Sequence, residues 1–273
     1  MAKVFKMLDE KYRRLCEIIR RKKSAVVAFS GGVDSSVLAA VAYSVLGENA
    51  MAVTVKSPTM PESELECAIK VAREIGVPHI VVEHDELSNK KFKSNPKDRC
   101  YYCKIELAKV LKKISSARGV KSILEGTNAE ETRSHRPGFK ALKENNISTP
   151  LAEAGFTKKD VRSLARRLSL SNANKPSGAC LSSRIPYGEE ITKARLEKIA
   201  EAESIIKQLG VKQLRVRDHD PIARLEVTPQ DFNLVLSNRR TIARKLSQLG
   251  FRYVTLDLCG YTEGSMNDHS EAS

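Results

Sequence analysis

The 273-residue sequence lacks tryptophan, has few aromatic residues and contains no long apolar stretch. Aromatic residues make up only 5% of the chain, which leaves few side chains on which RNA bases could stack. No segment is apolar for the roughly 20 residues that a membrane-spanning helix requires. The sequence therefore excludes a membrane protein that spans the bilayer with helices. It predicts no membrane partner and argues against nucleic acid as a partner.

The N-terminal segment also lacks the features of a secretion signal. It has no continuous apolar region and no cleavage site of small residues, and its apolar side chains recur at helical spacing, at Phe5, Leu8, Tyr12, Leu15 and Ile19. We therefore expect an amphipathic helix here and a cytoplasmic protein. Six cysteines in such a chain favour metal binding or catalysis over disulfides.

The chain is strongly basic, with 47 lysines and arginines against 33 aspartates and glutamates and a net charge of +14. This excess favours anionic partners such as nucleotides, phosphorylated metabolites or RNA. Much of it lies in runs such as 20–23 and 239–244, which are typical of solvated helix faces. Charge alone therefore leaves the partner open.

Apolar runs of strand length alternate with helical segments in the first part of the chain. The runs cover residues 25–29, 51–55, 79–83 and 121–126. Uninterrupted apolar strands separated by helices predict a parallel sheet covered on both faces, which is a doubly wound α/β domain. Ligands in such sheets bind at the carboxyl ends of the strands.

The pattern changes at residues 171–190, which are rich in Ser, Asn, Gly and Pro. Beyond this segment, a helical stretch at about 192–209 and strand-like stretches at 213–217, 222–227 and 252–258 predict a smaller α+β domain. We expect a first domain at 1–172, a linker at 173–190, a C-terminal domain at 191–262 and a disordered tail at 263–273.

A loop of phosphate-binding character directly follows the first apolar run and opens the next helix. Glycines permit close backbone approach, and hydroxyls, backbone N–H groups and the helix N-terminus can bind phosphate oxygens. The loop lacks the Gly-Lys-Ser/Thr ending of kinase P-loops and the Gly-x-Gly-x-x-Gly dinucleotide pattern. Asp34 could hold Mg²⁺ on the phosphates. The predicted phosphate-binding residues are Ser30, Gly31, Gly32, Val33, Asp34, Ser35 and Ser36.

Cys100 and Cys103 lie beside Arg99 and Lys104 just before a predicted helix. Neighbouring positive charge and a helix N-terminus lower a thiol pKa and favour thiolate ligation, and the spacing lets both sulfurs reach one metal. A redox pair is an alternative, but a thioredoxin-like motif would follow the first strand of its own fold. Zinc would need two further ligands.

Cys180 offers a third sulfur, and three cysteines suit a [4Fe–4S] cluster that keeps one iron open for a sulfur atom or substrate. The alternative is that Cys180 is an ordinary buried thiol. Its polar neighbours, with Ser183 and Arg184 following closely, instead favour an anion-binding turn. The remaining cysteines, Cys16, Cys67 and Cys259, lie in helical or strand-like segments and are predicted to fill the core.

Four charged residues in the strand-like segments alternate as one face of a strand requires, namely Arg215, Arg217, Arg224 and Glu226. One explanation is a salt-bridged strand surface. The other is a clamp for phosphate and carboxylate groups, which arginine binds well in a bidentate manner.

The heptad SGGVDSS after an apolar strand resembles the PP-loop of the ATP-pyrophosphatase superfamily. The resemblance implies that ATP is cleaved between its α and β phosphates, which leaves an adenylated substrate and pyrophosphate. A second turn, Glu125-Gly126-Thr127-Asn128, looks like the nucleotide-side loop of that superfamily, so Gly126, Thr127 and Asn128 join the expected ATP site. Taken alone, this turn could be a simple strand-to-loop connection with an Asn cap.

Further segments together resemble the LarE-type sulfur transferases over roughly residues 10 to 262. They are DRCYYCK, EGTNAEE, the turn at Arg136, STPLAEAGFTKKDVR and KPSGACLSSRIPYG. The resemblance implies sulfur insertion into a pyridinium dicarboxylate mononucleotide, on the way to the nickel-pincer cofactor of lactate racemase. It also implies a homo-oligomer, expected to be a hexamer, and a phosphate site at the four charged strand residues.

The family offers two sulfur sources. In one subtype the cysteine matching Cys180 gives up its own sulfur and becomes dehydroalanine. In the other, cysteines matching Cys100, Cys103 and Cys180 bind a [4Fe–4S] cluster that carries an extra sulfide. Because all three are present, we favour the cluster, with ATP, Mg²⁺ and [4Fe–4S] as cofactors and sulfide or another sulfur donor as partner. The implied catalytic residues are Asp34, Cys180, Ser183 and Arg184.

Two other functions fit part of this pattern. A tRNA thiolation enzyme would share the PP-loop, the three cysteines and the basic charge, but this chain lacks additional zinc-binding cysteine pairs and has few aromatic residues. A nucleotide-binding sensor without catalysis would keep the loop, but it would have no need for the aspartate and three cysteines of the predicted site.

Overall fold

The computed structural model describes residues 2–132, 137–176 and 178–262, and the chain divides into two compact units. The first unit contains residues 1–86 and 98–178, and the second contains residues 87–97 and 179–273. The division after residue 178 lies inside the segment predicted as a linker. Residues 87–97 group with the second unit, which the sequence pattern does not anticipate. The predicted tail at 263–273 and Arg136 lie outside the described residues.

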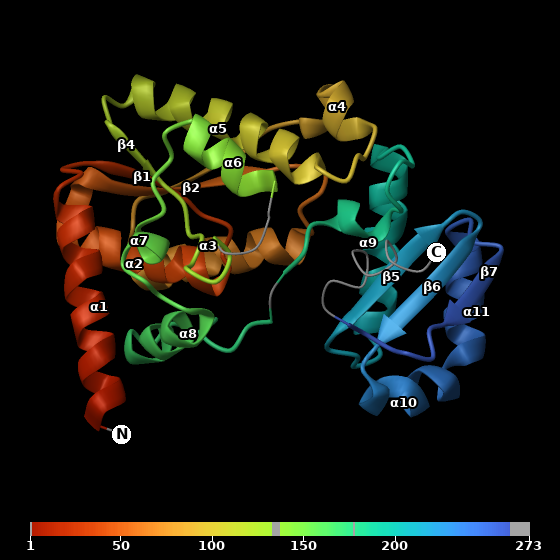
Figure 1. Cartoon of the computed structure of the whole chain (residues 1–273). Helices are drawn as coiled ribbons and strands as arrows, with labels where there is room; N and C mark the ends of the chain where they lie inside the picture. Colours follow the sequence, from red (N-terminus) through yellow and green to blue (C-terminus); the bar gives the residue numbers. More distant parts are fainter. Residues whose placement is uncertain (1, 133–136, 177, 263–273) are drawn as a thin grey trace, which may run out of the picture. The chain divides into compact units, whose positions relative to one another are not determined.

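The first unit alternates helices and strands (Figure 1). Among the described residues, no helix is both long and apolar enough to cross a membrane. The elements of the first unit are α1 (Ala2–Arg20), β1 (Ala25–Ala28), α2 (Val33–Leu46), η1 (Gly47–Asn49), β2 (Ala50–Lys56), α3 (Glu62–Ile75), β3 (His79–Glu83), α5 (Arg99–Ala117), β4 (Ser122–Leu124), α6 (Pro137–Glu144), α7 (Pro150–Glu153) and α8 (Lys158–Arg167). The short helix η2 (Glu86–Ser88) begins in the first unit and ends in the second.

The strands of the first unit form one parallel sheet in the order β3-β2-β1-β4. Successive side chains point to opposite faces, so Val27 and Ala52 join a core with α1, α2, α3 and α8, whereas Val26 and Val53 pack with α5 and α6. Figure 1 shows the sheet between these two helical layers. The predicted doubly wound α/β domain is therefore confirmed.

The second unit contains a small mixed sheet in the order β5-β6-β7. β5 and β6 are antiparallel, and β7 is parallel to β6. Apolar side chains of α9, α10 and α11 cover one face of this sheet, which confirms the predicted α+β architecture. The elements are α4 (Lys90–Lys93), η3 (Leu181–Arg184), α9 (Lys193–Lys207), β5 (Leu214–His219), β6 (Ile222–Val227), η4 (Pro229–Asp231), α10 (Phe232–Ser237), α11 (Arg239–Gln248) and β7 (Tyr253–Leu256).

Asn95 explains why residues 87–97 belong to the second unit. This fully buried residue adopts a left-handed conformation with φ of 54°. Its side-chain amide donates to the carbonyl of Ile185 at 3.2 Å and to that of Pro186 at 2.7 Å, and its own carbonyl accepts from the Gly188 N–H at 2.9 Å. A buried amide with these partners holds the segment against the turn that follows η3.

Candidate active site

The phosphate loop joins the carboxyl end of β1 to the first turn of α2, as the sequence predicts. Gly31 has φ of 70°, and a Cβ atom there would lie 2.7 Å from the Cα of Ala68 in α3. No real side chain tolerates that distance, so α3 and the loop can approach only because residue 31 is glycine. Gly32 then caps α2, whose first turn contains Asp34.

Changing Gly31→Ala is expected to destabilise the protein by about 2–4 kcal/mol, because overpacking adds to the cost of positive φ. Gly47→Ala is the matched control: Gly47 has φ of 56°, but its Cβ would meet nothing within 4 Å. Thermal unfolding of both variants measures the difference. Equal losses of stability would show that the contact with Ala68 is unimportant.

Asn172 holds the loop from the other side. Its buried side-chain amide donates to the Gly31 carbonyl at 2.9 Å and to Ser36 Oγ at 2.8 Å. Ser35 Oγ donates to the Gly32 carbonyl at 3.0 Å. The loop is thus fixed by hydrogen bonds before a nucleotide binds, which lowers the ordering cost of binding. Asn172 was not predicted as a site residue, because it lies far along the chain in a polar segment.

Asp34 accepts contacts from two distant side chains of the same unit. Asn128 Nδ2 donates to its Oδ1 at 3.1 Å, and the Lys158 ammonium forms a short ion pair with its Oδ2. Lys158 is the first residue of α8 and lies between Thr157 and Asp160, which form the capping box of this helix. Oδ2 of Asp34 thus faces a positive charge, and a carboxylate oxygen is also the kind of ligand that Mg²⁺ prefers. Lys158 is a site residue that the sequence analysis missed.

The second predicted loop touches the first one. A Cβ atom on Gly126 would lie 2.9 Å from the Ser35 nitrogen, so glycine is required for this close approach. Before it, Glu125 pairs with Lys104 at 2.7 Å. Burial opposes both charges, but the attraction of the partner outweighs it, so the pKa of Lys104 is raised and the pKa of Glu125 is lowered. The pair therefore stays ionised at neutral pH.

The cysteine pair lies inside the N-terminal end of α5, not just before the helix as the sequence predicted, and belongs to the first unit. Cys100 is exposed, whereas the Cys103 thiol is partly buried and donates to Glu86 Oε2 at 3.4 Å. Glu86 is itself buried and accepts hydrogen bonds from Ser57, at 2.9 Å, and from Thr59. The loops that follow β2 and β3 thus hold one of the two thiols, through a carboxylate that the sequence analysis did not single out.

Cys180 lies in the second unit, at the start of η3. Its sulfur is exposed and lies 2.9 Å from Ser182 Oγ. The Arg184 guanidinium donates to the carbonyls of Ala179 and Cys180 and to Ser183 Oγ, at 2.8 to 3.0 Å. Arg184 is buried and pairs with Glu203 of α9 at 2.8 Å. This arrangement fixes the backbone of the turn and leaves the thiol accessible.

The four charged strand residues share one face of the β5–β6 ladder, as their alternation predicts, because Arg215 pairs in register with Glu226 and Arg217 with Arg224. Glu226 binds Arg217 at 2.7 Å and Arg224 at 3.0 Å, so it serves as their counter-ion. Within the described residues Arg215 forms no ion pair and stacks on Tyr261. Burial and the nearby Arg184 charge lower the pKa of Arg215.

The expected site residues therefore form two groups, each within its own unit. Among the described residues, no three His, Cys, Asp or Glu side chains are gathered as ligands of one metal ion, so the cluster on three cysteines stays a prediction. Cys16 and Cys67 pack against the core as expected. The prediction for Cys259 is wrong, because this residue follows β7 in a turn and is exposed.

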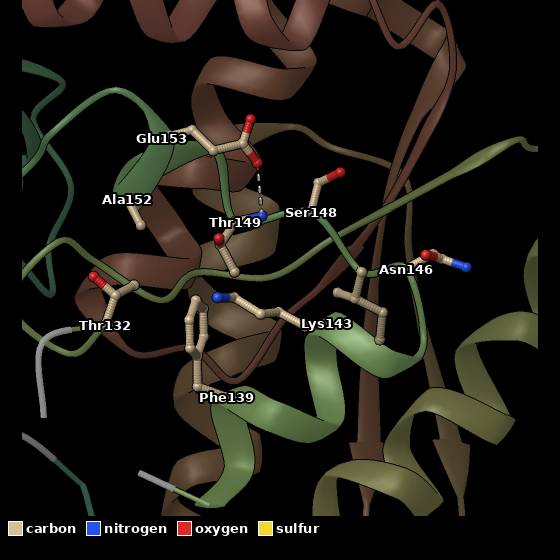
Figure 2. Close-up of a pocket in the computed structure, with 9 residues that line it drawn as sticks. Thr132, Phe139, Lys143, Asn146, Ser148, Thr149, Ala152 and Glu153 are labelled. Carbon is tan, nitrogen blue, oxygen red and sulfur yellow. Dashed lines mark hydrogen bonds between the residues drawn. The ribbon is translucent and has the colours of Figure 1, made fainter. Parts of the chain in front are cut away.

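A separate open cavity of about 740 Å³ lies beside α6 and α7 in the first unit (Figure 2). Phe139 and Lys143 of α6 border it, with the Lys143 ammonium 4.7 Å from the centre of the Phe139 ring. Thr149 lies between them and Glu153, whose carboxylate accepts from the Thr149 N–H. No residue of the phosphate loop lines this cavity, so it is distinct from the nucleotide site.

Comparison with known proteins identifies relatives of this chain. The asparagine synthase family model matches residues 19–217. The uncharacterized protein slr1717 of Synechocystis is 40% identical over 96% of this chain and 98% of its own. The pyridinium-3,5-bisthiocarboxylic acid mononucleotide synthase of Lactiplantibacillus plantarum is 37% identical over 96% and 95%, respectively. One subunit of the glutamine-hydrolyzing GMP synthase of Pyrococcus furiosus is 28% identical over 74% and 68%.

The family match spans the phosphate loop, the second nucleotide loop, the cysteine pair and the Cys180 turn. The relatives of 40% and 37% identity extend the similarity over 96% of the chain. The chain therefore belongs to the asparagine synthase family of PP-loop ATP pyrophosphatases, within which it is a LarE-like enzyme.

Proposed function

We propose that this enzyme uses ATP to adenylate a carboxylate of a pyridinium dicarboxylate mononucleotide and then delivers sulfur to the activated carbon. The observation that carries the proposal is the phosphate loop, in which Asp34 is aligned by Asn128 and Lys158. The end-to-end similarity to a pyridinium-3,5-bisthiocarboxylic acid mononucleotide synthase supports the choice of substrate. The thiocarboxylate product would serve biosynthesis of the nickel-pincer cofactor of lactate racemase.

Activation is needed because a carboxylate repels nucleophiles and offers no acceptable leaving group. A carboxylate oxygen of the substrate attacks the α phosphorus of ATP, and the bond to the β-phosphate oxygen breaks to release pyrophosphate. In the mixed anhydride that forms, the acyl group no longer carries the negative charge of the carboxylate, so its carbonyl carbon is open to nucleophilic attack. Sulfur then adds to this carbon, and AMP departs with the bridging oxygen.

Residues of the first unit fit the adenylation step. Consecutive N–H groups of the loop 30–36 and the N-terminus of α2 can bind phosphate oxygens. Asp34 would hold Mg²⁺, which neutralises phosphate charge. The Lys158 ammonium pairs with Asp34, and we propose that it binds the departing pyrophosphate.

Three thiols fit the sulfur-delivery step in donor chemistry, since Cys100, Cys103 and Cys180 each carry a sulfur that can ligate iron as a thiolate. We propose that they hold a [4Fe–4S] cluster, which would supply a bound sulfide. The alternative uses Cys180 alone: its thiolate attacks the adenylate to form a thioester, a base removes the Cys180 α proton, and the Cβ–S bond breaks. That route leaves dehydroalanine on the protein and sulfur on the substrate.

The second unit would bind the mononucleotide. Arg215 is the member of the charged face that forms no ion pair among the described residues, and its lowered pKa reflects burial beside Arg184. A phosphate at this position would relieve the repulsion between guanidinium groups. Arg217 and Arg224 are already paired with Glu226, so we propose that they shape the face rather than supply free charge.

Changing Lys158→Met is expected to lower kcat for substrate-dependent pyrophosphate release by about 10²-fold, because a preorganised cation that stabilises developing phosphate charge is lost. A phosphate-release assay coupled to inorganic pyrophosphatase measures it. Lys159→Met is the matched control, since Lys159 is the exposed neighbour on the same helix. Equal rates for the two variants would remove Lys158 from the mechanism.

A further inference from the structure

We propose that Lys104 and Glu125 are positioning residues that couple the cysteine pair to the nucleotide loop at 126–128. Lys104 directly follows Cys103 in α5, and Glu125 directly precedes Gly126 after β4. The inference rests on the proposed nucleotide site, but not on the identity of the sulfur acceptor. All four residues belong to the first unit.

The first link is the ion pair between Lys104 Nζ and Glu125 Oε1, at 2.7 Å. The two side chains are only 29% and 14% exposed, so solvent screens this pair less than most surface pairs in the molecule. Removing one partner of such a pair leaves an uncompensated charge beside the loop. Without the Lys104 ammonium, the Glu125 carboxylate would no longer be held in this position.

The second link uses the other oxygen of the same carboxylate. Glu125 Oε2 accepts from the Thr127 N–H at 2.7 Å and from Thr127 Oγ1 at 2.5 Å. A carboxylate is rigid and planar, so the position of Oε1 on Lys104 determines where Oε2 holds Thr127. The lysine of α5 thereby sets the conformation of the nucleotide loop.

The third link connects this loop to the phosphate site. Gly126 lies against the backbone of Ser35, and Asn128 donates to Asp34 at 3.1 Å. A displacement of Thr127 would move both of its neighbours, because they share its backbone. The contacts therefore run without interruption from Cys103 to the carboxylate proposed to hold Mg²⁺.

At the other end, a ligand on Cys103 must replace the hydrogen bond from its thiol to Glu86. Any resulting shift of the first turn of α5 moves the backbone of Lys104 with it. Binding at the cysteine pair and binding of Mg·ATP should consequently alter each other's affinity. Thermodynamic linkage requires the two effects to be equal in size.

The first experiment measures Mg·ATP binding by calorimetry, with a non-hydrolysable analogue. Lys104→Met and Glu125→Gln are each expected to weaken binding at least about fivefold. Lys104→Arg retains the positive charge and should bind within about twofold of the wild type. The matched control is Lys198→Met, which removes an ion pair with Asp218 in the second unit, at 3.2 Å and 17% and 0% exposure, and should leave Mg·ATP binding unchanged.

A charge reversal separates positioning from a merely structural role. The double variant Lys104→Glu/Glu125→Lys restores an ion pair and should recover thermal stability. It should not recover Mg·ATP affinity, because a lysine at 125 cannot accept the hydrogen bonds from Thr127. If the single variants fail to fold, Thr127→Val keeps the ion pair and should still weaken binding. The proposal would be overturned if any one of Lys104→Met, the charge reversal or Thr127→Val bound Mg·ATP with wild-type affinity.

The second experiment tests coupling directly with cobalt(II), whose thiolate charge-transfer absorbance reports binding at sulfur. The Cys100→Ser/Cys103→Ser variant identifies the band that belongs to the pair. With excess Mg²⁺, the ATP analogue should shift cobalt affinity at least about fivefold in the wild type and should have no such effect in Lys104→Met. No shift in the wild type, or the same shift in both, would refute coupling. Absence of thiocarboxylate product would refute only the proposed function.

Discussion

Replacing Cys180 with alanine is expected to abolish thiocarboxylate formation while ATP-dependent adenylation continues. In both mechanisms Cys180 is required, either as the source of sulfur or as a cluster ligand. The loss should reach at least about 10³-fold, the scale seen when a nucleophile is removed. The side chains that hold Asp34, by contrast, all lie in the first unit. Mass spectrometry of the product, together with pyrophosphate release, measures the two steps separately.

Cys259→Ala is the matched control, because Cys259 is another exposed thiol of the second unit and should be dispensable. Parallel loss of adenylation and sulfur transfer in Cys180→Ala would contradict the assignment of Cys180 to the second step. The variants Cys100→Ala and Cys103→Ala then distinguish the sulfur sources. They should lose sulfur transfer if three cysteines hold a cluster, and they should retain it if Cys180 is sacrificed.

Changing Asp34→Asn is expected to lower adenylation by about 10²- to 10³-fold. The amide can still accept from Asn128, but it cannot hold Mg²⁺, and it leaves the Lys158 ammonium without its partner. Pyrophosphate release measured across a range of Mg²⁺ concentrations tests this. Asp9→Asn also removes an aspartate paired with one cation, Arg167, and should leave the rate unchanged. Normal Mg²⁺ dependence in Asp34→Asn would contradict the proposed site.

The phosphate loop was predictable from sequence because everything that defines it is contiguous. An apolar strand, a turn that requires glycine and an apolar-periodic helix follow one another within residues 25–46. The parallel sheet was predictable for a similar reason, since buried strands and covering helices leave different periodicities. Gly31 adds a point that the pattern does not show, which is that α3 packs against the loop at this residue.

The residues that complete the site were not predictable, because each reaches it from a distant and unremarkable position. Lys158 is one of two adjacent lysines at the start of a helix. Its ion pair with Asp34 depends on where the fold places the start of α8, and the sequence does not show this. Asn172 lies in a polar segment with the composition of a linker. A sequence pattern contains no information on which of many similar side chains will meet across such separations.

The charged strand face shows where periodicity stops being informative. The alternation of charged residues correctly predicts that Arg215, Arg217, Arg224 and Glu226 share one face. A salt-bridged strand surface and a phosphate clamp both require this placement, so it does not distinguish them. Only the register and the rotamers show that Glu226 neutralises two arginines while Arg215 lies outside that network. The cluster on three cysteines and the hexamer depend on contacts beyond one unit, and both stay predictions.

The most direct test is an anaerobic assay that combines the pyridinium dicarboxylate mononucleotide with ATP, Mg²⁺ and sulfide, and that follows thiocarboxylate and intact protein mass together. We expect several iron-dependent turnovers per chain with unchanged protein mass. At most one sulfur per chain, with loss of hydrogen sulfide from Cys180, would replace the cluster by the sacrificial route. No thiocarboxylate from a protein that binds Mg·ATP would contradict the proposed function.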